Sequence, residues 1–307
     1  MPVYEQTYRH YDGPRTVARR WLPIMRMTMR PYWANKRNLF LPLLLCCYMI
    51  VSGVLFYIAG QARTLVPKEA QDQLGSVGAA ARFPLPGLNM DLQTLCFLFL
   101  SSSLVIVWLM MLQQAGIICN DLRNGAYTLY FSRPLRTRDY VVGKILGLLV
   151  LPVSILVVTI LVAYVQAVSL VLNANQAWSA LWVVARGVLA SVAFTAVPVL
   201  SLLAASALAS SERYAGAIYL IFWFLLPTTV RALAKMAGLP IFLLFSPLTN
   251  IQVLLQNLLQ PSRIWHRDRL FREAAEYPEI ALLTFVAYLC LFVLIIVRRM
   301  RSVEVVR

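Results

Sequence analysis

Residues 141–172 read VVGKILGLLVLPVSILVVTILVAYVQAVSLVL, and Lys144 is the only charged side chain in this run. About 20 apolar residues are enough to cross the hydrocarbon core of a bilayer, so the run predicts a membrane-spanning helix. The whole chain shares this character, because 60% of its 307 residues are hydrophobic and 13% are charged. A soluble domain carries about a quarter charged residues. The sequence therefore predicts an integral membrane protein.

Further apolar stretches on both sides of this run predict an all-α, polytopic membrane protein with about six spans. The basic N-terminal segment, residues 1–38, precedes a transmembrane domain formed by residues 39–307. The expected spans of that domain are residues 40–59, 92–119, 141–172, 181–208, 215–230 and 280–297.

An outer loop, residues 231–279, is expected before the last span. Its apolar stretch, 239–259, is interrupted by Pro247 and by the amide side chains of Asn250, Gln252 and Gln256. This interruption favours a re-entrant or interfacial hairpin over a full crossing. A full crossing would give seven spans and move one terminus to the other side of the membrane.

The net charge of +15 has two possible meanings. In a soluble protein such a charge suggests a nucleic-acid partner. Here the basic residues flank the apolar runs, as the positive-inside bias predicts, and we expect no nucleic-acid partner. This bias places both termini and the loop 120–140 in the cytoplasm. We expect a multi-pass protein of the cell membrane, that is, the inner or plasma membrane of a bacterium. Four arginines of the outer loop depart from the bias: Arg263, Arg267, Arg269 and Arg272.

The N-terminal segment carries an amphipathic pattern that begins near Val17. Apolar and amphipathic side chains return at helical spacing, and arginines fall on the opposite side, among them Arg19, Arg26 and Arg30. This pattern predicts a helix in the membrane interface, with its arginines toward lipid phosphates or a protein partner. Pro23 leaves open whether the segment forms one helix or two short ones.

No catalytic motif is visible in the chain. It lacks a phosphate-binding loop, a zinc-protease motif, a nucleophile elbow and paired carboxylates. The five cysteines and two histidines have no ligand spacing, so we expect neither a metal site nor a cofactor on this chain. Arg186 is the one clear intramembrane charge; it either snorkels to the interface or lines a substrate path.

The loop between the second and third expected spans, residues 120–140, combines arginines with aromatic side chains. Arginine and aromatic residues at a surface are typical of protein-binding hot spots. A basic loop resting on anionic lipid is the alternative. The aromatic and arginine residues of the loop include Arg123, Tyr127, Tyr130, Phe131 and Arg133, the last followed by Pro134.

The loop also contains a recognisable pattern. Asp121-Leu122-Arg123-Asn124-Gly125, then Leu129 to Pro134 (LYFSRP), then Asp139-Tyr140 and Gly143-Lys144, resemble the cytoplasmic signature of ABC type-2 exporter permeases. The resemblance implies an exporter permease that pairs with a second copy or a paralogue. It also implies a separate cytoplasmic ABC ATPase subunit that binds the ATP and magnesium.

The resemblance assigns roles to particular residues. The loop, called the coupling helix in that family, would contact the ATPase. The interface helix, to which Arg19, Arg26 and Arg30 would belong, would share this contact. Gly143 and Gly147 are expected to serve close helix packing. The expected docking residues are Asp121, Arg123, Tyr127, Tyr130, Arg133 and Pro134.

Two other functions remain open from the sequence. One is a membrane-embedded lipid-modifying enzyme, which the scarcity of acidic residues and histidines argues against. The other is a non-transporting membrane scaffold that recruits a cytoplasmic partner. A docking surface has the same composition whether or not a substrate is transported, so the scaffold needs an experiment to separate it from an exporter.

Overall fold

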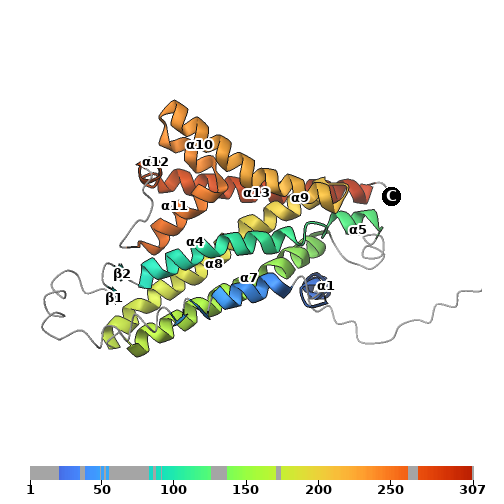
Figure 1. The fold of residues 1–307 in the computed structure, drawn as a ribbon. Coiled ribbons are helices and arrows are strands. Elements are labelled where there is room, and N and C mark those ends of the chain that lie inside the picture. Colours follow the sequence, from blue (N-terminus) through green and yellow to red (C-terminus); the bar gives the residue numbers. More distant parts are fainter. Residues whose placement is uncertain are drawn as a thin grey trace, which may run out of the picture.

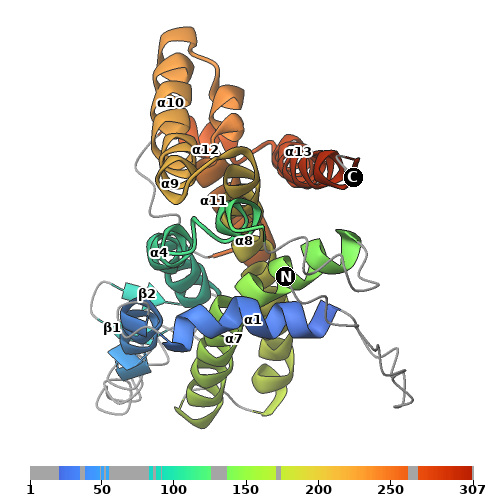
Figure 2. The ribbon, with the colours of Figure 1, turned by 90° about the vertical axis from the view of Figure 1, so that its right-hand side faces the viewer.

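The computed structural model describes most of the chain as a bundle whose long helices run along one common direction, with α1 lying across them (Figure 1 and Figure 2). The described residues are 21–34, 39–48, 50–51, 53–54, 83–85, 88–90, 92–125, 137–170, 174–261 and 269–305. Their elements are α1 (Trp21–Ala34), β1 (Phe83–Leu85), β2 (Leu88–Met90), α4 (Leu92–Leu112), α5 (Cys119–Arg123), α7 (Thr137–Leu170), α8 (Ala174–Leu208), α9 (Glu212–Leu220), η1 (Ile221–Leu225), α10 (Leu226–Ala237), η2 (Pro240–Phe245), α11 (Pro247–Leu259), α12 (Arg269–Ala274) and α13 (Pro278–Val305).

Four stretches of the described helices are long and apolar enough to cross a membrane: Thr137–Val165, Ala180–Leu208, Glu212–Ala237 and Pro278–Met300. They coincide with the third to sixth predicted spans. Two shorter apolar helices, Leu39–Tyr48 and Cys96–Leu112, lie where the first two spans were predicted. The chain is thus a helical, multi-pass membrane protein, and the count of six spans stays a prediction.

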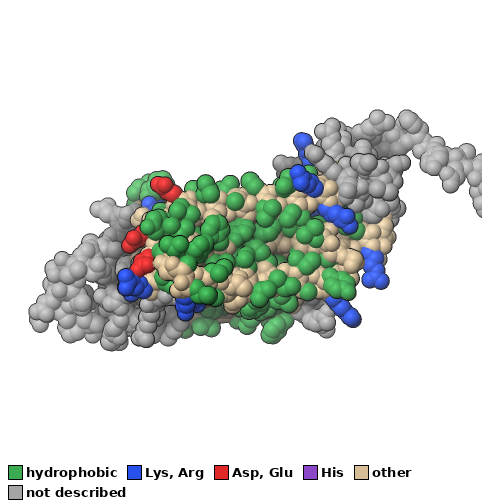
Figure 3. All heavy atoms as spheres, turned by 90° about the horizontal axis from the view of Figure 1, so that it is seen from above, with side chains coloured by type: hydrophobic (Ala, Val, Ile, Leu, Met, Phe, Trp, Pro, Cys, Tyr) green, Lys and Arg blue, Asp and Glu red, His purple; other side chains and the backbone are tan. Residues whose placement is uncertain are grey.

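Apolar side chains cover the middle of the molecular face seen in Figure 3, and charged side chains gather at its two ends. One of these ends carries α1, α5 and the carboxyl end of α13, and is here called the α1 end (Figure 1). The opposite end carries α12 and the β1–β2 pair. This distribution is that of a protein whose middle lies in hydrocarbon and whose ends lie in water.

Helix α8 forms the centre of the bundle. Of its span, 72% is buried inside the protein, compared with 22% for Glu212–Ala237 and for Pro278–Met300. Residues 197–207 are all buried, and many of them are alanine or serine. Small side chains let neighbouring helices approach closely, as predicted for this half of the span.

The fifth predicted span is longer than expected, because the helix that begins at Glu212 continues to Ala237 instead of ending near Val230. Pro227 has no N–H to donate within the helix, and the π-helix η1 lies directly before it. The Thr228 hydroxyl donates to the carbonyls of Phe224 (3.0 Å) and Leu225 (2.8 Å). These bonds help to satisfy the backbone around the proline, so the helix passes through it.

The apolar stretch 239–259 before the last span consists of η2 and α11 and follows α10 directly. Gly238, with φ of 65°, ends α10 in the left-handed region that glycine adopts most easily. Ser246 caps α11, its Oγ accepting from the Thr249 N–H at 3.4 Å. Among the described helices, α11 has only 13 residues and is not one of the four candidate spans. This length is short for a full crossing, which needs about 20 residues, and the re-entrant hairpin stays a prediction.

The described fold is helical, as expected, apart from one short antiparallel pair, β1 with β2, in which Phe83 is opposite Met90. Within residues 120–140, α5 covers the first residues and α7 begins at Thr137.

Candidate functional site

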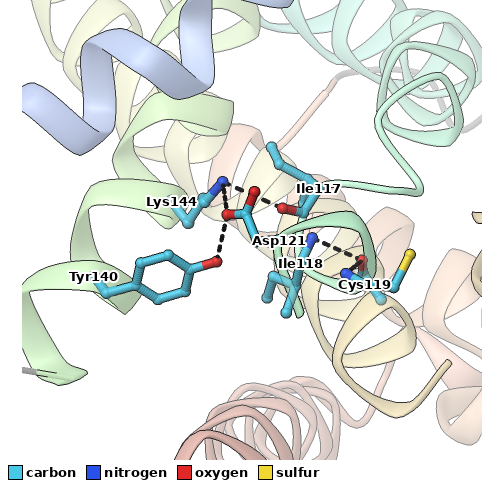
Figure 4. Close-up of polar contacts among 7 residues, drawn as sticks. Ile117, Ile118, Cys119, Asp121, Tyr140 and Lys144 are labelled. Carbon is cyan, nitrogen blue, oxygen red and sulfur yellow. Dashed lines mark hydrogen bonds and ion pairs between the residues drawn. The ribbon is translucent and has the colours of Figure 1, made fainter. Parts of the chain in front are cut away.

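A cluster of polar contacts at the α1 end attaches α5 to α7, and is here called the Asp121 cluster (Figure 4). The Lys144 ammonium lies 2.7 Å from Oδ2 of Asp121. The Tyr140 hydroxyl donates to the same carboxylate oxygen at 2.8 Å. Lys144 also donates to the carbonyl of Ile117 at 3.2 Å. One hydrogen-bond and ion-pair network thus joins α5, the turn before it and the first turns of α7.

The Asp121 cluster is mostly shielded from solvent. The Lys144 side chain is 8% exposed and that of Asp121 is 20% exposed. The ammonium also lies 5.5 Å from the centre of the Tyr140 ring, within range of a cation–π contact. Removing one partner of such a pair leaves an uncompensated charge, so the pair resists separation far more than a surface ion pair does. The cluster is therefore a firm attachment between α5 and α7.

A second attachment joins the start of α5 to α8. The residues between α4 and α5 form a tight turn, and the N–H groups of Ile118 and Cys119 donate to Oγ of Ser206 at 3.0 and 3.1 Å. Ser206 itself is fully buried. The first N–H groups of a helix lack partners within it, and here a side chain from α8 supplies one. The turn and α5 are consequently fixed to the central helix as well as to α7.

Helix α1 crosses α7 at two glycines (Figure 2). A Cβ on Gly143 would lie 2.8 Å from Cβ of Ile24, and one on Gly147 would lie 2.6 Å from Cβ of Thr28. Real Cβ atoms do not approach so closely, so only glycine permits this crossing. The two positions form a small-xxx-small pair, and the prediction that they serve close helix packing is confirmed. Lys144 lies between them, so one turn of α7 holds both α1 and α5.

The structure confirms the amphipathic character of the described part of the N-terminal segment. Ile24, Thr28 and Tyr32 are buried, whereas Arg26 and Arg30 are exposed. The described helix is continuous from Trp21 to Ala34 and includes both Pro23 and Pro31. Arg19 lies outside the described residues.

The docking residues predicted in the loop divide into three groups. Arg123, at the carboxyl end of α5, is exposed. Asp121 instead turns its carboxylate toward α7, so a partner could contact that carboxylate only by competing with Lys144. The third group lies outside the described residues and comprises Tyr127, Tyr130, Arg133 and Pro134.

Buried charge in the membrane-spanning part is not confined to the predicted residue. Arg186 is half-buried in α8 and forms no ion pair with any described acidic residue. Lys144, in the candidate span that begins at Thr137, is more deeply buried. Sequence reasoning treated Lys144 only as part of a signature, because nothing in the pattern shows that Asp121 reaches it. The roles of Tyr140 and Ser206 in attaching α5 to α7 and α8 were missed for the same reason.

Burial has a further effect on α1. It raises the pKa of the Tyr32 phenol well above its ordinary value, which keeps the group neutral. The hydroxyl has no hydrogen-bond partner among the described residues. Within the described residues, no group of three or more histidine, cysteine or acidic side chains could hold a metal ion. The α1 end is thus built for attachment between helices.

These features define the class of the protein: a multi-pass helical membrane protein in which a peripheral helix and a short loop helix are anchored to the bundle at one end. The family model described as ABC-2 family transporter protein matches residues 56–302. The chain therefore belongs to the ABC-2 transporter family and is a permease of an ABC transporter. The resemblance seen in residues 121–144 is confirmed by this match. No curated protein matches the sequence.

Proposed function

We propose that this permease is an exporter subunit that moves its substrate with ATP hydrolysed by a separate cytoplasmic ATPase subunit. The α1 end would lie in the cytoplasm with both termini, and α1 and α5 would form the surface that the ATPase contacts. ATP and magnesium would bind to the partner, and a second permease copy or a paralogue would complete the transport path. Family membership supports association with an ABC ATPase.

The observation that carries the proposal is the double attachment of α5. A force applied to α5 reaches α7 through the Asp121–Lys144 pair and reaches α8 through Ser206. A loop tied to the bundle by exposed contacts alone would lose its shape under the same force, because such contacts contribute about 0–1 kcal/mol each. The Asp121 cluster can therefore transmit movement of the ATPase to the membrane-spanning helices, and in this role it is called the coupling joint.

The exposed arginines supply the surface that the joint would serve. Arg26 and Arg30 project from α1, and Arg123 projects from the end of α5. Arginine is enriched at protein interfaces because its planar head makes several directed hydrogen bonds. We propose that these three side chains contact the ATPase, and that any of them lying beyond its edge rests on lipid phosphates.

Co-purification with the ABC ATPase subunits of the host membrane, followed by ATP turnover in lipid vesicles, tests the proposal. Arg123→Glu is expected to lower the stimulated turnover several-fold without loss of folded protein. Lys235→Glu, an exposed charge reversal on α10, is the matched control and should leave turnover unchanged. A chain that binds no ATPase, or whose complex shows no substrate-dependent turnover, would favour the membrane scaffold instead.

A further inference from the structure

Helices α8, α11 and α13 enclose a cavity of about 450 Å³ that the proposed coupling mechanism does not use. Its walls include Leu189 and Ala193 from α8, Leu254 and Leu258 from α11, and Leu282 and Phe285 from α13. Ligand pockets in proteins measure about 300–1,000 Å³. The cavity is therefore large enough for a ligand.

The lining is almost wholly hydrocarbon. Among the described residues that line it, Asn257 has the only polar side chain, and the amide nitrogen of Asn257 donates to the Val253 carbonyl of its own helix at 2.9 Å. An ordered buried water needs about two to four polar partners. The walls do not offer such a set, so they favour an apolar occupant over water or a polar solute.

The cavity opens sideways at the level of the membrane. Two of its three walls belong to the candidate spans Ala180–Leu208 and Pro278–Met300. Leu189 and Leu282 line the cavity and are also 61% and 56% exposed, so they form its mouth. The exposed Val192 and Leu283 continue the same apolar surface on either side. The interior is thus continuous with the surface that meets lipid chains.

The third wall is fixed in place, which keeps the cavity open. Asn250 is buried in α11, and its amide donates to the carbonyls of Leu244 (3.1 Å) and Ala281 (2.9 Å) and to the Thr284 hydroxyl. The Tyr288 hydroxyl donates to the Phe245 carbonyl. These bonds hold α11 and η2 against α13, so α11 cannot move toward α8 independently of α13 without breaking buried hydrogen bonds.

We propose that this cavity binds one acyl chain of a membrane phospholipid. The chain enters between Leu189 and Leu282, and the headgroup lies near Pro278, at the end of the bundle opposite Arg298 and Arg299. A second copy of the protein would cover the mouth with side chains but would leave the hollow unfilled. An acyl chain fills it without exposing any polar atom to hydrocarbon.

Photolabelling in vesicles of one synthetic phosphatidylcholine, doped with an analogue that carries a diazirine in its acyl chain, tests the proposal. Because no transport substrate is present, labelling reports the phospholipid itself. We expect residue-level labelling of Leu254, Leu258 and Phe285 at least fivefold above that of the merely lipid-facing Leu283. The readout needs no ATPase, so it stands apart from the proposed function.

Two variants fill the cavity independently: Ala193→Phe narrows its interior, and Leu282→Trp blocks its mouth. Each should reduce labelling of Leu254 and Leu258 at least fivefold, whereas the matched controls Val192→Phe and Leu283→Trp should not. Leu282 is exposed, so its variant keeps the fold even where Ala193→Phe disturbs it. Labelling that is equal on all lipid-facing residues would overturn the proposal.

Discussion

Replacing Lys144 with methionine removes the cation of the Asp121 cluster and keeps an unbranched side chain of similar length. Breaking one side of a fully buried ion pair costs about 3–5 kcal/mol. Asp121 keeps its hydrogen bond from Tyr140, and 20% of its side chain remains exposed to water. We therefore expect a smaller loss, about 2–3 kcal/mol of unfolding free energy.

A double variant, Asp121→Asn with Lys144→Met, separates the pair from its surroundings. It removes both charges, so no uncompensated ion remains, and we expect it to recover about 1–2 kcal/mol relative to the sum of the single variants. The Arg269–Glu273 pair provides a matched control, because it has the same 2.7 Å separation but an Arg269 side chain that is 87% exposed. Arg269→Met should cost about 0.5 kcal/mol or less.

Reversible unfolding of the purified protein in detergent, with denaturant as the variable, measures these differences. In the complex with its ATPase, Lys144→Met should also lower ATP turnover more than it lowers complex formation, because the joint and not the docking surface is altered. If the losses of Lys144→Met and Asp121→Asn simply add in the double variant, the two charges are not coupled and the reasoning fails.

Three further variants test other contacts. Gly147→Ala should destabilise the protein by about 1–3 kcal/mol, because its Cβ would meet Thr28 at 2.6 Å; Gly216→Ala, whose nearest neighbour would lie at 3.6 Å, should be tolerated in the same thermal-unfolding assay. Asn250→Leu should cost about 1–3 kcal/mol and increase proteolysis near α11, whereas protection unchanged from the wild type would contradict its role as an anchor. Tyr32→Phe should be neutral or stabilising at pH 7. Burial raises the pKa of this phenol in the native protein. The native protein therefore loses stability as pH rises above about 10, where the phenol of the unfolded chain ionises. Unfolding curves measured over a pH series should show that the Tyr32→Phe variant lacks this part of the loss.

The membrane-spanning helices could be predicted because their signal is local. The run 141–172 needs only its own composition to indicate a span, and the alternation of buried and exposed residues in α1 needs only helical spacing. The packing role of Gly143 and Gly147 was expected together with the family resemblance. These features follow from residues near one another in the chain.

The features that sequence reasoning missed depend on contacts between distant segments. Lys144 resembles an isolated charge until the turn after α4 brings Asp121 to it, and Ser206 resembles a small packing residue until that turn reaches α8. The extension of the fifth helix beyond Val230 was missed because the charged residues Arg231 and Lys235 resemble the start of a loop. The threonine bonds to backbone carbonyls and the π-helix that carry the chain through the proline leave no clear mark in the composition.

The order of Asp121 and Lys144 in the chain has a consequence for biogenesis. An unpaired lysine at the centre of a helix costs about 2.5–3.5 kcal/mol when that helix enters the membrane from the insertion machinery. Lys144 stands near one end of its helix, where the cost is lower, and Asp121 has already been synthesised when it emerges. A nascent chain can thus neutralise the lysine as it inserts. An Asp121→Asn chain would meet its difficulty during insertion, before any partner subunit is bound.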